Sequence, residues 1–170
     1  VNIFQFWDSF NEAHQIARSC GFCYRTTQVS QRISFEVKYP ISDSFGFSPN
    51  IDVVIENTPA SKYKVYAIEC KFTEAYGGRV HSGLKEKYLD LEIWEGIPYL
   101  HKLAKLISPK DNQFQYLHAA QLIKHILGLK RAFGKTAFRL LYLWYDALGI
   151  EGAKHREEIN EFLEKAKSDD

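Results

Sequence analysis

The chain has 170 residues, 45% of them hydrophobic, which is enough for one domain with a substantial core. Its 22 basic and 21 acidic side chains nearly balance, and this neutrality neither requires nor excludes a nucleic-acid partner. No stretch has the apolar length of a membrane-spanning helix, and the first residues lack a secretory signal pattern. These features predict a single soluble domain over residues 1–170, located in the cytoplasm.

Helical and strand periodicities alternate along the chain in the way that is typical of an α/β protein. In chain order the predicted elements are a helix over 4–18, strands over 32–39, 51–55 and 65–73, a loop over 74–83, helices over 84–94, 97–107 and 116–133, a strand over 137–145 and a helix over 154–167. The helices within residues 84–107 form an insertion that the sheet does not need. The strand over 137–145 is apolar on both faces, which predicts a buried central strand with helices on each side.

The three cysteines are too few for a disulfide framework. Cys20 and Cys23 form a C-x-x-C pair, which zinc or redox chemistry uses in other proteins. Zinc would need two more ligands, and a redox pair normally follows a strand, whereas this pair ends a helical pattern. Two packed thiols are therefore the preferred interpretation.

Two neighbouring strands carry charged residues on faces that are otherwise largely apolar. Glu69 and Lys71 share one side of the later strand, and Asp52 points away from Ile51 and Val53 in the earlier strand. A turn joins the strands as an antiparallel pair, which would bring Asp52 beside Glu69. Two carboxylates and an ammonium group would then converge, an arrangement that is costly unless something uses it.

The chemistry that suits this cluster is metal-assisted hydrolysis of a phosphodiester. Carboxylates favour a hard cation such as Mg²⁺ or Mn²⁺, and the backbone carbonyl of Cys70 is a further candidate ligand. Such a metal polarises a phosphoryl oxygen and lowers the pKa of bound water. Lys71 would orient or deprotonate the attacking water, or hold the scissile phosphate. The alternative is a surface salt bridge between Glu69 and Lys71 on an ordinary hairpin.

These residues resemble the motif of the PD-(D/E)XK nuclease superfamily, which has the restriction-endonuclease-like fold. Asp52 matches the first aspartate and Glu69-Cys70-Lys71 matches the (D/E)XK run, although two residues separate Pro49 from Asp52. The resemblance covers roughly residues 11–146 and extends to a bacterial restriction-endonuclease-like branch. It implies an α/β core with a central mixed four-stranded sheet flanked by helices in the order αβββαβ, together with the insertion and the C-terminal helix. It also implies that Asp52, Glu69 and Lys71 are catalytic.

The resemblance adds two candidates outside the motif. Nucleases of this fold often open with a helix whose acidic residue reaches the metal, which makes Glu12 a candidate ligand, with a solvated helix face as the alternative. The helix after the lysine strand often places a glutamine beside the site, and Gln121 with His125 is similar to that pattern. A transition-metal site that includes His118 is an alternative for this helix, and a partly buried imidazole is the alternative for His125.

The implied function is a Mg²⁺-dependent endonuclease that hydrolyses DNA. A non-cleaving nucleic-acid-binding module of the same fold and an interaction domain without nucleic acid are the alternatives. Eight basic residues and one acidic residue lie within residues 101–139, which favours phosphate contacts if the basic residues share a face. The loop over 41–48 is a second candidate for DNA contact and for mobility beside the site. Nucleases of this kind often dimerise to cut both strands, so the resemblance leaves a homodimer open.

Overall fold

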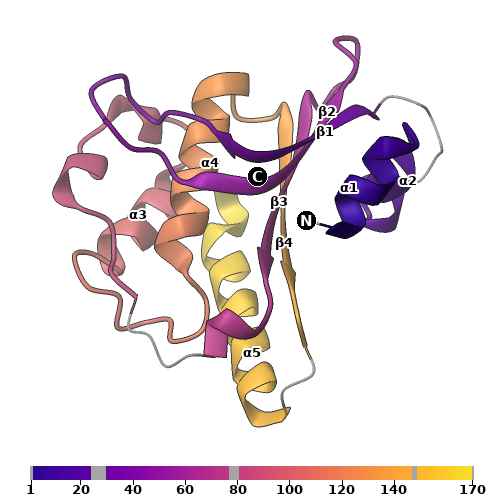
Figure 1. The fold of residues 1–170 in the computed structure, drawn as a ribbon. Helices are drawn as coiled ribbons and strands as arrows, with labels where there is room; N and C mark the ends of the chain where they lie inside the picture. The colour runs from indigo at the N-terminus through magenta and orange to yellow at the C-terminus, as the bar shows by residue number, and fades with distance from the viewer. Residues whose placement is uncertain (1, 24–29, 77–80, 147–148, 170) are drawn as a thin grey trace. The chain divides into compact units, whose positions relative to one another are not determined.

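The computed structural model describes residues 2–23, 30–76, 81–146 and 149–169 (Figure 1). The chain divides into two compact units, the first with residues 1–70 and 128–143 and the second with residues 71–127 and 144–170. The single domain expected over the whole chain therefore stays a prediction. No helix in the described part of the chain is long and apolar enough to cross a lipid bilayer.

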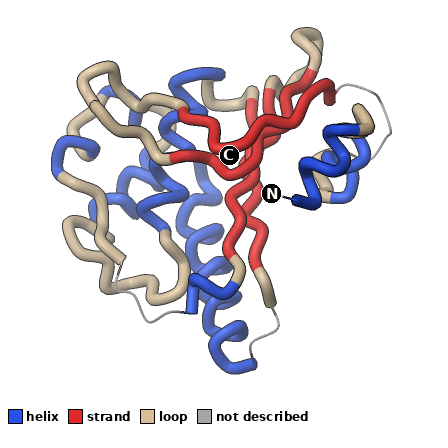
Figure 2. Tube along the Cα trace, in the orientation of Figure 1, coloured by secondary structure: helices blue, strands red, loops and turns tan. Residues whose placement is uncertain are grey.

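Helices and strands follow one another in the predicted α/β order (Figure 2). The elements are α1 (Asn2–Ser9), α2 (Ala13–Ser19), β1 (Ser30–Lys38), β2 (Asn50–Asn57), β3 (Val65–Lys71), α3 (Pro98–Leu106), α4 (Ala119–Phe133), β4 (Phe138–Trp144) and α5 (Gly149–Ala166), with short 3-10 helices η1 (Thr73–Tyr76), η2 (Glu86–Tyr88), η3 (Glu92–Trp94) and η4 (Lys167–Asp169). The loop predicted over 74–83 begins within η1, and its residues 77–80 lie outside the described residues.

The four strands form one mixed sheet in the order β1-β2-β3-β4. β1 pairs antiparallel with β2, and β2 pairs antiparallel with β3. β3 and β4 run parallel, because the Lys64 N–H donates to the Ala137 carbonyl at one end and the Tyr145 N–H donates to the Lys71 carbonyl at the other. The parallel neighbours are joined by a long crossover that contains α4, as parallel pairing requires. The predicted mixed four-stranded sheet is therefore confirmed.

Helices cover both faces of the sheet within the first unit. One face packs against α1 and α2 in a cluster that includes Phe4, Ile16, Ile33, Val53 and Ile68. The other face packs against the end of α4 in a cluster that includes Val54, Val65, Ala67, Leu129 and Phe133. The strands carry the polar residues of the candidate site, and these residues lie between the two apolar layers.

The predicted central position of β4 is wrong. β4 ends the strand order of the described sheet, and its residues are only partly buried. Leu141 and Leu143 pack on the α1–α2 cluster, whereas Phe138 and Leu140 pack on the α4 cluster. The apolar run therefore indicates that both faces of β4 are covered. It does not indicate which strands lie beside β4.

The alternation predicted for β2 holds from Val53 onward and breaks before it. Ile51 joins the α4 cluster, whereas Val53 joins the α1–α2 cluster, so the two do not share a face. The opposing strand makes the same change, because Val37 pairs with Ile51 and packs on the α4 cluster. Between these positions Glu36 has a φ of 53°, in the left-handed region that L-residues rarely adopt. This irregularity in β1 lies directly beside Asp52.

The helix predicted over 4–18 is instead two helices. Asn11 has a φ of 56° between α1 and α2, and the chain changes direction there. Phe10, predicted on the apolar face, is 61% exposed because it lies in this break. Asn is among the residues that tolerate the left-handed region, and its short polar side chain gives the physical reason for the interruption.

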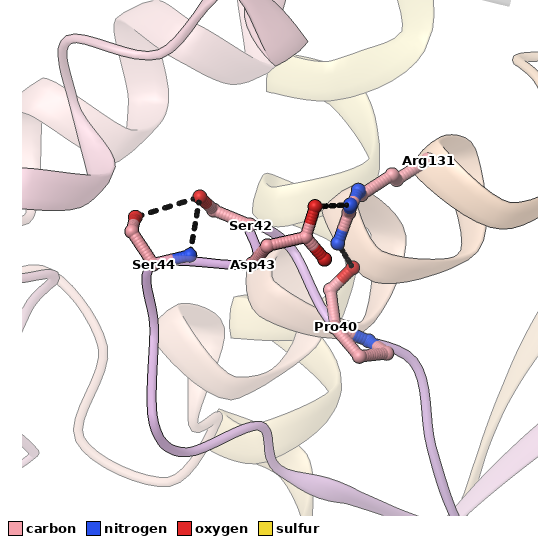
Figure 3. Close-up of polar contacts among 5 residues, drawn as sticks. All are labelled: Pro40, Ser42, Asp43, Ser44 and Arg131. Atoms are coloured by element: carbon pink, nitrogen blue, oxygen red, sulfur yellow. Dashed lines mark hydrogen bonds and ion pairs between the residues drawn. The ribbon is translucent and has the colours of Figure 1, made fainter.

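The loop over 41–48 is anchored to α4 within the first unit (Figure 3). Arg131 of α4 donates to the carboxylate of Asp43 at 2.7 Å and to the carbonyl of Pro40 at 3.2 Å. The Ser44 backbone N–H donates to the Ser42 hydroxyl at 3.3 Å, which tightens the same turn. Arg131, one of the eight basic residues within 101–139, is therefore bonded to other residues of the chain. Because the Asp43 carboxylate is exposed, solvent screens the pair and it contributes little to stability.

The helix predicted over 84–94 is instead two 3-10 turns, whereas the helix predicted over 97–107 is confirmed as α3. The Trp94 indole N–H donates to the Tyr88 carbonyl at 2.7 Å, so this carbonyl is bonded outside any helical ladder. The His101 ring bonds the Leu89 carbonyl at 2.8 Å and stacks on Trp94 with 4.5 Å between ring centroids. Side chains thus hold the insertion in an irregular but well-bonded shape.

In the second unit, α5 holds the segment that precedes α4. The Glu158 carboxylate accepts hydrogen bonds from the backbone N–H groups of Gln115, Tyr116 and Leu117, each at 2.8 Å. These bonds keep the segment outside the helix, which explains why α4 begins at Ala119 and not at 116. Helical spacing in the helix predicted over 154–167 puts Leu163 on the inward face, but this prediction is wrong, since the side chain is 57% exposed.

Candidate functional site

Asp52 and Glu69 lie just beyond the regular β2–β3 ladder in the first unit. Val53 pairs with Ile68, and Asp52 and Glu69 are the next residues of their strands in that direction. The Cys70 backbone N–H donates to Asp52 Oδ2 at 2.7 Å, which ties the aspartate to β3 beside Glu69 in the sequence. Neighbouring strands therefore carry both carboxylates at this end of the ladder, and their meeting in one site stays a prediction.

The Glu69 side chain is buried. Ile68 and Cys70 pack on the α1–α2 cluster, so alternation turns Glu69 toward the α4 face, where Ala67 lies. Glu69 is 1% exposed and Asp52 is half-buried. Two carboxylates held close together repel each other unless a proton or a cation intervenes. A cation between these two carboxylates would relieve that repulsion.

The donors present here fit a hard divalent cation. The Asp52 and Glu69 carboxylates and the Cys70 carbonyl are all oxygen donors, and Mg²⁺ typically takes one or two carboxylates and keeps several waters. Among the described residues, no three His, Cys, Asp or Glu side chains gather closely enough to hold a metal together. Glu12 precedes α2, with its Oε2 3.2 Å from Nε2 of His14, and its role as a ligand stays a prediction.

Lys71 is the last residue of β3 and lies two residues after Glu69. Regular alternation would put its side chain on the same face as Glu69, and this shared position stays a prediction. Its carbonyl accepts a hydrogen bond from the Tyr145 N–H at 3.0 Å, so the strand is still paired at this position. The lysine is thus presented by a bonded strand end rather than by a loose loop.

Within the second unit, Lys71 is close enough to His118 to affect its protonation. Burial is the largest cause that lowers the pKa of His118 to about 4; the charges of His81, Lys124 and Lys71 act in the same direction, and a hydrogen bond to Gln121 opposes them. His118 is therefore neutral near pH 7. Gln121 and His118 therefore lie near Lys71 within the second unit. In the sequence, only the family resemblance indicated a position for Gln121 beside the site.

His81 is a member of this group that the sequence did not indicate. Its ring stacks on His118 with 4.6 Å between centroids and 16° between planes. Nearly parallel rings do not aim their nitrogens at a common point, so this pair is not arranged as a transition-metal site. His125 is 2% exposed, in agreement with the buried imidazole considered for it. His81 lies in a loop far from α4 in the sequence, so no periodic pattern could have identified it as a neighbour of His118.

The C-x-x-C pair is packed rather than exposed. Cys20 and Cys23 are free thiols, and both are partly buried against the α1–α2 cluster. Burial raises the pKa of the Cys20 thiol, which disfavours the reactive thiolate. The interpretation as two packed thiols is confirmed.

A second neutral histidine lies in the second unit, where α5 meets η1. His155 is fully buried, its Nδ1 lies 3.1 Å from the Tyr76 hydroxyl, and its ring packs 4.7 Å from that of Trp144. Burial lowers the pKa of His155 to about 4, although Asp146 opposes this shift. The aromatic surroundings therefore hold the imidazole uncharged.

These two histidines predict a loss of stability in mild acid. Because the pKa of His118 and of His155 is about 4 in the folded chain and 6.5 in the reference state, the unfolded chain takes up protons first. The free energy of unfolding should be constant above about pH 7 and fall between about pH 6.5 and pH 4. The slope should approach about 1.4 kcal/mol per pH unit for each histidine, less the part that solvent screens.

Urea unfolding at pH 7.5, 6.0 and 5.0 measures this dependence. The change His155→Phe should remove about one proton from the slope. Equal stability of the wild-type chain at pH 7.5 and pH 5.0 would contradict the prediction.

The αβββαβ order, the mixed sheet and the acidic pair on β2 and β3 define a restriction-endonuclease-like α/β protein. A family model described as "Restriction Endonuclease associating with ARP" matches residues 13–170, and the chain belongs to this family. In the comparisons with curated proteins and with solved structures, none matches the chain.

Proposed function

We propose that the chain is a Mg²⁺-dependent endonuclease of the PD-(D/E)XK type that hydrolyses phosphodiester bonds of DNA. The observation that carries the proposal is the hydrogen bond from the Cys70 backbone N–H to the Asp52 carboxylate at 2.7 Å, which joins Asp52 of β2 to the strand that carries Glu69. The membership in a restriction-endonuclease family supports the same reaction class and makes DNA the substrate of choice.

The groups of the proposed site have three kinds of role: metal binding, positioning of water or phosphate, and support of those residues. Asp52, Glu69 and the Cys70 carbonyl would hold the cation. The chemistry that Mg²⁺ or Mn²⁺ supplies at such a site is polarisation of a phosphoryl oxygen and activation of water. Lys71, predicted on the same face as Glu69, would orient the attacking water or hold the scissile phosphate. Gln121 would act through His118, which it bonds beside Lys71 in the second unit.

A plasmid-nicking assay tests the proposal. Wild-type protein should nick supercoiled DNA with Mg²⁺ and fail to do so with EDTA, and Lys71→Ala should abolish nicking. The matched control is Lys62→Ala, which removes an exposed lysine from the turn between β2 and β3 and should leave nicking intact. Cleavage that survives EDTA or Lys71→Ala would overturn the proposal. DNA binding without cleavage would favour the non-cleaving module.

The homodimer stays a prediction. Sedimentation of the purified chain would measure its oligomeric state.

A further inference from the structure

Both strands of the β1–β2 pair change face at one position. Phe35 pairs with Val53, and both pack on the α1–α2 cluster. Val37 pairs with Ile51, and both pack on the α4 cluster. Residues two apart on a regular strand share a face of the sheet, so each strand rotates between these two pairs. The rotation falls on the one residue of each strand that lies between them.

The intervening residues are Glu36 on β1 and Asp52 on β2. One residue on each strand separates the two pairs, so no extra residue is inserted as it would be in a β-bulge. The irregularity is in the backbone of Glu36, whose φ is 53°. Side chains other than those of Asn and Asp rarely adopt this left-handed conformation. Strain of this kind persists only where the surrounding structure imposes it, and it is concentrated at functional sites.

The side chain of Glu36 helps to hold its backbone in this conformation. Its Oε2 accepts a hydrogen bond from Nδ2 of Asn50 at 2.7 Å. Asn50 pairs with Lys38, so this bond runs diagonally across the strand pair to the residue two positions before Asp52. Among the described residues, no third carboxylate joins Asp52 and Glu69 closely enough to hold a metal with them. Glu36 is therefore placed to act on Asp52 through the backbone and not as a ligand.

The position of Asp52 determines which atoms of β3 its carboxylate reaches. Oδ2 of Asp52 accepts a hydrogen bond from the Cys70 N–H at 2.7 Å, beyond the Val53–Ile68 pair that ends the regular β2–β3 ladder. The Asp52 carboxylate thus connects β2 to the segment of β3 that carries the proposed metal ligands. Because Glu36 and Asp52 occupy the same position in the β1–β2 pair, a change in the Glu36 backbone would move this carboxylate relative to Cys70.

We propose that Glu36 is a positioning residue whose left-handed backbone holds the Asp52 carboxylate against β3. The assignment rests on the proposed nuclease function, in which Asp52 and the Cys70 carbonyl hold the cation. Glu36 acts through Asp52 and does not itself bind the metal. A misplacement of about 1 Å can slow a reaction about 100-fold, so a positioning residue of this kind has a measurable effect on cleavage.

Hydrogen exchange of the Cys70 amide tests the position of Asp52 without any cleavage. Glu36→Val introduces a β-branched residue, which strongly disfavours the left-handed conformation, so the Cys70 N–H should exchange about 10-fold faster or more. Glu36→Gly also removes the carboxylate, but glycine adopts this conformation readily, so exchange should stay within about 2-fold of the wild-type rate. The Asn57 N–H, bonded to the Lys64 carbonyl at 2.9 Å at the other end of β2, corrects for any overall loss of stability.

Cleavage with Mg²⁺ should follow the same order. At saturating DNA the rate of Glu36→Val should fall about 10- to 100-fold with KM little changed, because the metal site is displaced and the DNA contacts are not. Glu36→Gln keeps an oxygen acceptor for Asn50 and removes only the charge, so it should restore wild-type cleavage. The control is Lys38→Val, which places the same β-branched residue at an exposed position of β1 outside the left-handed region and should leave Cys70 exchange unchanged.

The outcomes separate a backbone role from a role of the carboxylate. Unchanged Cys70 exchange in Glu36→Val would overturn the proposal, and so would equally fast exchange in Glu36→Gly. If the Glu36→Val chain does not fold, Glu36→Ala takes its place, and equal Cys70 exchange in the alanine and glycine variants would overturn the proposal. Loss of cleavage in Glu36→Gln would make the charge itself essential and would also overturn it. Wild-type protein that does not cut would overturn the nuclease proposal, whereas Cys70 exchange would still decide the positioning of Asp52.

Discussion

Replacement of Glu69 by glutamine is expected to lower Mg²⁺-dependent cleavage about 1,000-fold, which corresponds to about 4 kcal/mol of transition-state stabilisation. The change keeps the size of the side chain and removes one of the two carboxylates proposed to hold the cation. Single-turnover cleavage of a labelled duplex measures the loss. Asp52→Asn should have an effect of the same order, because both carboxylates serve one site.

The same change should not weaken the fold in the absence of metal. Glu69 is 1% exposed, so a neutral side chain removes the cost of burying a charged carboxylate. The melting temperature of the Glu69→Gln chain in EDTA should therefore equal or exceed that of the wild-type chain. The control is Glu56→Gln, farther along β2, where the carboxylate bonds Arg32 at the surface and cleavage should persist. Full activity of the Glu69→Gln chain would rule out the proposed metal site.

Gly83→Ala is expected to destabilise the chain by about 3 kcal/mol, at the upper end of what overpacking usually costs. A Cβ at this position would collide with the carbonyl oxygen of Ile107 and lie 2.7 Å from the Cα of Ser108. Both obstacles are backbone atoms, which cannot rotate away as a flexible side chain would. The two segments would have to separate, and the hydrogen bond from the Gly83 N–H to the Pro109 carbonyl would be lost.

Urea unfolding measures this change, with Gly46→Ala as the control of the same chemistry. A Cβ at Gly46 would meet no atom within 4 Å, so this variant should be as stable as the wild-type chain or slightly more stable. Equal stability of Gly83→Ala and the wild-type chain would contradict the close backbone approach between these segments.

Much of the fold was predictable because its signals are local. The alternation in β2 and β3 and the short turn between them predict the antiparallel pair of strands that carry Asp52 and Glu69. The periodicity of α3 and α4 likewise identifies helices close to their observed bounds. At Asn11 and Glu36 the sequence keeps its periodic pattern, but the backbone leaves the regular conformation.

The sequence by itself determined the α/β order and the hairpin, because these depend on residues a few positions apart or on one hairpin register. Only the tertiary structure decided that β4 lies at the end of the sheet, that His81 stacks on His118 and that Lys124 lies over the ring of Tyr88. Such contacts join segments far apart in the chain, and their positions depend on how whole helices and strands pack. Periodicity reports which face of an element is buried, and it does not report what covers that face.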